Sequence, residues 1–161
     1  MSYPQARHLA DGGEPSARLR RVGEPPDLVT GTTSVHYLAT SATTGGDFGL
    51  YRWDMAGPGG PAPHFHRTIS ESFFVLSGTV RLYDGRRWTD AVPGDFLHVP
   101  PGGIHAFANS SGAPASMLLL FAPGAPREAY FEGLAELAAS GRELTDSERA
   151  EFLRRHDQYT V

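Results

Sequence analysis

Short runs of alternating apolar and polar residues dominate the middle of the chain. Within 48–55, Tyr51, Trp53 and Met55 are spaced two apart, so they share one face of a strand. Glycine, proline and an Asp-Gly pair punctuate the runs every few residues. The pattern predicts a turn at 43–47 and short strands at 34–40, 48–55, 71–77, 79–83, 86–91, 96–99, 104–109 and 116–121.

The hydrophobic period changes after Pro123. Residues 127–139 place Tyr130, Phe131 and Leu134 on one helical stripe, and residues 145–148 form a capping-box pattern that begins a second helix ending near 155. Residues 1–26 follow no period. We therefore predict a flexible or draped arm over 1–26, a barrel over 27–123 and a helical tail over 124–161. The helices could lie against the barrel, cover its mouth or contact a neighbouring subunit.

Composition supports an all-β fold. The 161 residues suit one domain, 40% are hydrophobic, and 19 glycines and 13 prolines favour many tight turns. Strands at this spacing predict a β-sandwich or jelly-roll barrel. The net charge of −4, without a basic block, argues against nucleic-acid or membrane partners. There is no cysteine, signal-peptide pattern or long apolar run, so we expect a cytoplasmic protein.

Three histidines and a glutamate form the candidate chemistry. His64 and His66 project to the same side of an extended segment, while Glu71 and His105 belong to two further predicted strands. These side chains converge only if the sheet curls into a barrel. Imidazole nitrogens and a carboxylate are common ligands of divalent transition metals, so the pattern predicts a metal site with an open coordination position. The alternative is that they are ordinary surface or core residues.

The spacing of these residues resembles the two motifs of the cupin superfamily. The segment His64-x-His66-x4-Glu71-x6-Gly78 is similar to the first motif, although Pro58 stands where a leading glycine is expected. The second motif, G-x5-P-x-G-x2-H-x3-N, is matched at every fixed position, by Gly94, Pro100, Gly102, His105 and Asn109. The resemblance covers roughly residues 28–123 and implies a jelly-roll barrel, with the glycines and proline shaping turns.

Residues 63–71 also look like those of small bacterial cupins of the quercetin 2,3-dioxygenase type. That resemblance implies one divalent metal (Ni, Fe, Mn, Co or Zn) bound by His64, His66, Glu71 and His105. It further implies O₂-dependent cleavage of a flavonol or similar enol substrate, with Glu71 acting as catalytic base as well as ligand. The alternative for Glu71 is a ligand role only.

Other functions fit the same residues. A redox-neutral isomerase, cyclase or lyase on a polyketide-like or sugar-like intermediate would use the Lewis-acid site without O₂. A non-catalytic small-molecule-binding cupin is a further alternative. Oxygen consumption would separate the first reading from the others, because a fold and a metal do not name a reaction.

Apolar residues around the candidate ligands predict a substrate pocket. If Glu71 faces inward, Phe73 and Val75 share its face, and Phe107 shares that of His105. The predicted lining is completed by neighbouring strands and comprises Phe48, Trp53, Phe73, Val75, Phe107, Met117 and Phe121. Ordinary core packing is the alternative for these side chains.

Two expectations concern the outer surface. His98 alternates with apolar neighbours, so we expect it to face solvent or an interface. Pairing through sheet edges would remove exposed strand edges, so we expect a homodimer.

Overall fold

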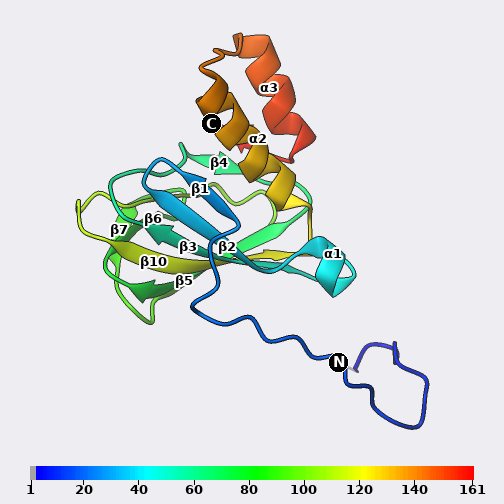
Figure 1. Cartoon of the computed structure of the whole chain (residues 1–161). Helices are drawn as coiled ribbons and strands as arrows, with labels where there is room; N and C mark the ends of the chain where they lie inside the picture. Colours follow the sequence, from blue (N-terminus) through cyan, green and yellow to red (C-terminus); the bar gives the residue numbers. More distant parts are fainter. Residues whose placement is uncertain (1–2) are drawn as a thin grey trace.

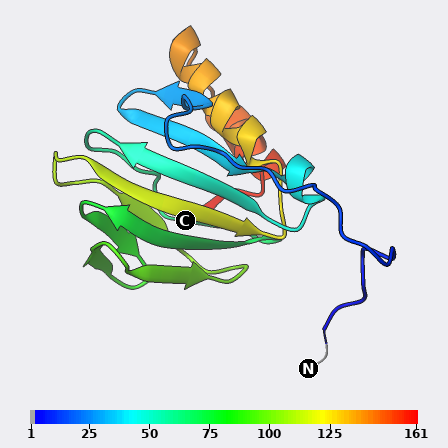
Figure 2. The same cartoon turned by 60° about the horizontal axis from the view of Figure 1, so that its bottom comes forward.

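Two antiparallel sheets form the body of the protein. The computed structural model describes residues 3–161, and its β-strands surround one core (Figures 1 and 2). The larger sheet has the order β1 (Leu28–Thr30), β2 (Thr33–Ala39), β3 (Gly49–Met55), β10 (Ala115–Ala122), β5 (Ser70–Ser77) and β8 (Phe96–Val99). The smaller sheet has the order β7 (Trp88–Ala91), β6 (Val80–Tyr83) and β9 (Ala106–Ala108). The predicted all-β barrel is confirmed.

Strand β10 shows how sequence alternation builds the core. Its residues Ala115, Met117, Leu119 and Phe121 are buried, and the residues between them are partly exposed. In register, Leu119 lies between Tyr51 of β3 and Phe73 of β5, which are fully buried. Each large side chain buried in this way contributes roughly 1.5–3 kcal/mol to folding. The inner faces of both sheets belong to this one core.

The predicted turn at 43–47 was wrong at its start. Residues Ser41–Thr44 form the short helix α1, because Thr40 and Thr43 cap it reciprocally through their side chains and backbone amides. The extended segment expected at His64 is present as β4 (His64–Phe65), but β1 and β11 (Tyr159–Thr160) were not predicted. Strands of two or three residues are too short to establish a hydrophobic period.

The two predicted C-terminal helices are present as α2 (Arg127–Ser140) and α3 (Asp146–Arg155). Both lie together at one end of the barrel (Figure 1). The chain then returns to the barrel, because β11 pairs with β4 in register Tyr159 to Phe65 and Thr160 to His64. The tail is therefore joined by backbone hydrogen bonds to the segment that carries two candidate ligands.

The N-terminal segment runs away from the barrel (Figures 1 and 2). Residues 3–26 contain no helix or strand, and nearly all of them are exposed. Arg20 anchors the end of this segment by pairing with Asp27 at 2.8 Å and donating a hydrogen bond to the Tyr37 carbonyl. None of the helices within residues 3–161 has the length and apolar character needed to cross a membrane.

Candidate metal centre

Backbone pairing brings the two sequence motifs together. His64 and His105 form an antiparallel bridge, with N-to-O distances of 3.0 Å and 2.8 Å between their amides and carbonyls. The Gly102 amide donates to the His66 carbonyl at 2.6 Å, which holds the loop before His105 against the segment that carries His64 and His66. Glu71 is the second residue of β5, beside this pair. These hydrogen bonds bring the segments that carry His64, His66 and His105 together, and the pairing of β5 with β8 and β10 places Glu71.

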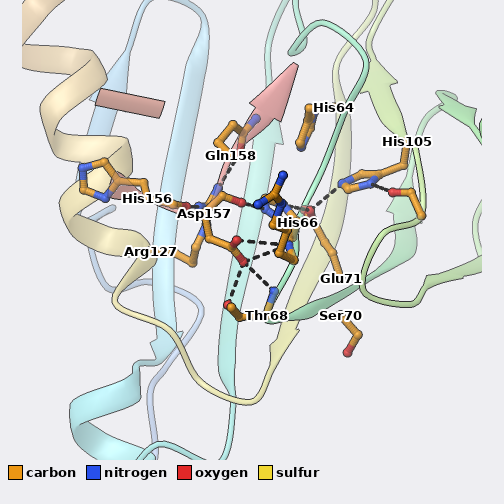
Figure 3. Close-up of polar contacts among 12 residues, drawn as sticks. His64, His66, Thr68, Ser70, Glu71, His105, Arg127, His156, Asp157 and Gln158 are labelled. Carbon is orange, nitrogen blue, oxygen red and sulfur yellow. Dashed lines mark hydrogen bonds and ion pairs between the residues drawn. The ribbon is translucent and has the colours of Figure 1, made fainter. Parts of the chain in front are cut away.

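The four side chains meet in the barrel interior (Figure 3). His64, His66, Glu71 and His105 are each no more than 3% exposed, and one donor atom from each lies within 4.8 Å of the others. The imidazole ring centroids are 4.3–5.4 Å apart. Three imidazoles this close would repel one another if all were protonated. The set thus favours neutral nitrogen donors that share a cation.

Backbone carbonyls determine the tautomer of each histidine. The Nδ1 atoms of His64, His66 and His105 lie 2.9, 2.6 and 3.0 Å from the carbonyl oxygens of Ala62, Asp157 and Gly103. A carbonyl only accepts, so each Nδ1 must carry the proton and donate it. Each Nε2 is then free to present its lone pair to a metal, the arrangement that outer hydrogen bonds impose on metal-binding histidines.

The contacts of Glu71 support the same conclusion. Its Oε2 atom lies 3.1 Å from Nε2 of His66 and 2.8 Å from Nε2 of His105. Since both Nδ1 atoms already carry protons, each Nε2 can donate to Glu71 only as an imidazolium. A divalent cation between these atoms would replace those protons. The donor set therefore suits a divalent transition metal.

The pKa shifts follow from burial and these contacts. Burial lowers the pKa of His64 to about 4, so its ring is neutral near pH 7. Burial alone would raise the pKa of Glu71, but hydrogen bonds from His105 and His66 hold it well below its usual range. Burial would lower the pKa of His105, yet the hydrogen bond and charge of Glu71 raise it overall. Glu71 is thus an ionised carboxylate in a buried site.

A cavity of about 260 Å³ adjoins the centre and includes His64 and Glu71 in its wall. Its lining is mainly apolar, and much of it is aromatic. Trp53 lies with its ring centroid 5.0 Å from that of Phe131 and 6.0 Å from that of Phe107. The glycines and proline of 59–61 and the partly exposed Leu134 also line it. The volume is just below the ~300–1,000 Å³ typical of small-molecule sites, so it suits a small ligand.

The seven residues expected to line the pocket fall into three groups. Trp53, Phe107 and Phe121 line this cavity. Phe73, Val75 and Met117 face inward but are fully buried in the core, and the cavity does not reach them. Phe48 is 38% exposed and lies outside the cavity. Phe48 directly precedes β3, and by strand alternation its side chain lies on the face opposite Tyr51 and Trp53.

The C-terminal tail also lines this cavity, which agrees with one of the placements left open for the helices, although its individual residues were not predicted. Arg127, Tyr130 and Phe131 of α2 and Gln158 after α3 all line it. Arg127 donates to the His156 carbonyl at 2.6 Å and to Oε1 of Gln158 at 3.1 Å (Figure 3). The position of Arg127 in the sequence was one local signal, because a cation in the first turn of a helix is opposed by the helix dipole. Gln158 offered no such signal.

Other histidines lie outside the centre. His98 is exposed on β8, as expected, with its Nδ1 2.9 Å from the Ser72 hydroxyl. His36 is buried against Arg52 and Asp54, where its Nε2 is 3.3 Å from the Asp54 carboxylate. Neither residue belongs to the four-residue cluster.

Comparison with known proteins agrees with this geometry. The family model described as "Cupin domain" matches residues 51–121. A quercetin 2,3-dioxygenase from Bacillus subtilis is 31% identical over 101 residues, which make up 62% of this chain and 29% of that enzyme. The chain therefore spans less than a third of the relative's length.

Solved structures share the fold at lower sequence identity. A predicted oxalate decarboxylase from Thermotoga maritima superposes with a TM-score of 0.60 at 15% identity, covering 66% of this chain and 99% of that one. The polyketide cyclase RemF from Streptomyces resistomycificus superposes with a TM-score of 0.57 at 22% identity, covering 68% and 81%. Identities this low support the architecture only.

Proposed function

Because residues 51–121 match the family model described as "Cupin domain", we propose that this chain is a cupin enzyme dependent on one divalent transition metal: Ni, Fe, Mn, Co or Zn. His64, His66, Glu71 and His105 would be the ligands. One observation carries the proposal: each of the three imidazoles has its Nδ1 against a carbonyl, leaving Nε2 to point at a shared position with Glu71. A cluster serving only to pack the core would gain nothing from this common tautomer.

The reaction we propose is an O₂-dependent cleavage of a small aromatic or enol substrate, as in quercetinase-like dioxygenases. The 31% identity to a quercetin 2,3-dioxygenase segment supports it. So does the aromatic wall formed by Trp53, Phe107 and Phe121, which suits a flat ligand. When bound, the metal would supply Lewis-acid polarisation of a substrate oxygen.

The residues of this chain would have distinct roles. Glu71 borders the cavity, so its carboxylate would be placed to accept a proton from a substrate hydroxyl once a metal replaces the imidazolium protons that lower its pKa. The carbonyls of Ala62, Asp157 and Gly103 keep the three histidines oriented. The apolar wall reduces access of water to the site and so strengthens its electrostatic interactions.

A redox-neutral reaction on an enolisable substrate is the second candidate. The polar pair Arg127 and Gln158 is the observation behind it, because a cation inside the cavity would stabilise the oxyanion of an enolate without any need for O₂. Such an isomerase, cyclase or lyase would use the same ligands and the same base.

Metal analysis followed by oxygen uptake tests the proposal. Protein purified without added chelator should retain about one metal per chain, His105→Ala should lose most of it, and His98→Ala should keep it. The last variant is a matched control, since it removes an exposed histidine outside the cluster. Metal that His105→Ala retains in full would refute the assigned centre.

Oxygen uptake with a panel of flavonols and small enols then separates the two reactions. Uptake that depends on His105 supports the dioxygenase. Conversion of an enol under anaerobic conditions, again lost in His105→Ala, would replace the dioxygenase with the redox-neutral reaction.

A further inference from the structure

Arg127 is an unusual residue for the interior of a barrel. Its side chain is 4% exposed, and it lines the same cavity as His64 and Glu71. Of the ion pairs formed within residues 3–161, none involves this guanidinium. A buried cation without an acidic partner is strongly disfavoured unless something else compensates for the lost water.

The hydrogen bonds of Arg127 leave one side of the guanidinium unused. Nη1 donates to the His156 carbonyl and Nη2 to Oε1 of Gln158, both of which are neutral acceptors. Nε is the one buried side-chain polar atom without a hydrogen-bond partner among the described residues. Native proteins seldom leave such a donor unsatisfied, and each case calls for an explanation.

Aromatic rings restrict where a partner for Nε can lie. The guanidinium carbon is 4.4 Å from the ring centroid of Tyr130, 5.1 Å from that of Phe121 and 5.5 Å from that of Phe131. These rings stabilise the cation through their faces but accept no strong hydrogen bond. Since guanidinium donors lie in the plane of the group, a partner for Nε must approach in that plane.

The charge of the neighbouring centre favours an anion. A divalent ion bound by three neutral imidazoles and one carboxylate keeps a net positive charge, and Arg127 adds another within the same cavity. Arg127 is also the first residue of α2, whose amino-terminal end carries partial positive charge. Among residues 3–161, Glu71 is the one acidic side chain that lines the cavity.

We propose that Arg127 binds the carboxylate of a small aromatic or enol acid, with Nε–H as a direct donor and Gln158 holding the guanidinium in place. The inference assigns a substrate class to the proposed enzyme, and it rests on the proposed metal centre. If Arg127 only anchored the tail, its two hydrogen bonds would be explained, but Nε would remain unsatisfied and the guanidinium would form no ion pair among residues 3–161.

Binding measurements on zinc-loaded protein test this inference without relying on turnover. The probes are benzoate, phenylacetate and cinnamate, each compared by calorimetry with its primary amide, a neutral molecule of similar shape. Wild type should bind at least one acid about 10- to 100-fold more tightly than its amide, as expected for a charge-assisted hydrogen bond in a buried site. Arg127→Met should reduce that ratio to near one, and Arg127→Lys should retain part of it.

Two controls distinguish loss of the acid-binding site from a general loss of charge or of the metal. Arg142→Met removes a cation from an exposed position in the same helical tail, so it should keep the wild-type ratio. Zinc content should be unchanged in every variant, because Arg127 is not a proposed ligand. Loss of zinc from wild type would be a failure of the proposed metal centre and not of the acid site.

Wild-type protein provides a second measurement if Arg127→Met does not fold. In ¹⁵N NMR spectra, one arginine Nε–H signal should shift on titration with the acid, remain in place with the amide and be absent from Arg127→Lys. An acid-to-amide ratio that persists in Arg127→Met, an Nε–H signal that no acid moves, or failure of every acid to bind zinc-loaded protein would overturn the inference.

Discussion

Asp157 joins the C-terminal tail to the loop that follows His66, and its removal tests how the tail supports the barrel. Its carboxylate accepts hydrogen bonds from the Arg67 amide at 3.0 Å, the Thr68 amide at 2.9 Å and the Thr68 hydroxyl at 2.7 Å (Figure 3). Its backbone carbonyl accepts from Nδ1 of His66. Asp157 is also the only non-glycine residue with positive φ, at 53°, within the described part of the chain.

The expected cost of Asp157→Ala has two parts. Three donors lose an ionised acceptor, at about 1.5–3 kcal/mol each if they were fully buried. Asp157 is partly exposed, so water replaces much of that interaction. The left-handed backbone then costs alanine a further 1–2 kcal/mol or so, whereas asparagine adopts it readily. We expect a total loss of roughly 2–4 kcal/mol for Asp157→Ala and about half of that for Asp157→Asn.

Thermal unfolding measures this loss. For a chain of this size, each kcal/mol lowers Tm by about 2–4 °C, so Asp157→Ala should melt roughly 5–15 °C below wild type. Asp90→Ala is the control, because it removes an exposed carboxylate in a weak surface ion pair and should change Tm by no more than a degree or two. Hydrogen exchange at the Thr68 and Thr160 amides should accelerate in Asp157→Ala more than exchange in β10.

Two outcomes would refute this reasoning. Equal Tm values for Asp157→Ala and Asp157→Asn would show that the left-handed backbone imposes no cost at this position. A Tm unchanged in both variants would show that the carboxylate does not hold the tail. If the tail positions His66, the zinc affinity of Asp157→Ala should also fall about 10- to 100-fold, the usual effect of disturbing a residue that supports a metal ligand.

Two further predictions concern the loop at the cavity rim and the N-terminal segment. Gly60→Ala should cost about 3 kcal/mol or more, because its φ is +156° and a Cβ there would lie 2.0 Å from the Phe107 carbonyl oxygen. Gly94→Ala, with φ +96° but open space around it, should cost only about 1–2 kcal/mol, and equal urea midpoints for the two would contradict the clash. Burial raises the pKa of Asp27, but a backbone amide and Arg20 lower it overall, so its charge stabilises the fold at neutral pH. The stability difference between wild type and Asp27→Asn should therefore disappear as the pH falls below about 3.9, and a difference that persists at pH 2 would contradict this assignment.

Local patterns in the sequence predict a large part of the fold and of the candidate site. The alternation in β5 and β10 determines which side chains face inward, because successive strand residues point to opposite faces whatever the strand packs against. For the same reason Phe73 shares the inner face with Glu71. The capping box at Thr145 begins α3 by contacts within four residues of one another. The spacing of the four candidate ligands was also visible without coordinates.

What the sequence could not determine depends on contacts between distant segments. The pairing of β11 with β4 involves two residues from each strand, and neither carries a period that identifies its partner. The entry of Arg127 and Gln158 into the cavity depends on how α2 and α3 pack and where the chain returns after them. The sequence alone therefore determined the faces of the strands and the donor set of the centre. Only the tertiary structure decided which parts of the helical tail complete the cavity, because packing between elements that are remote in sequence leaves no local pattern.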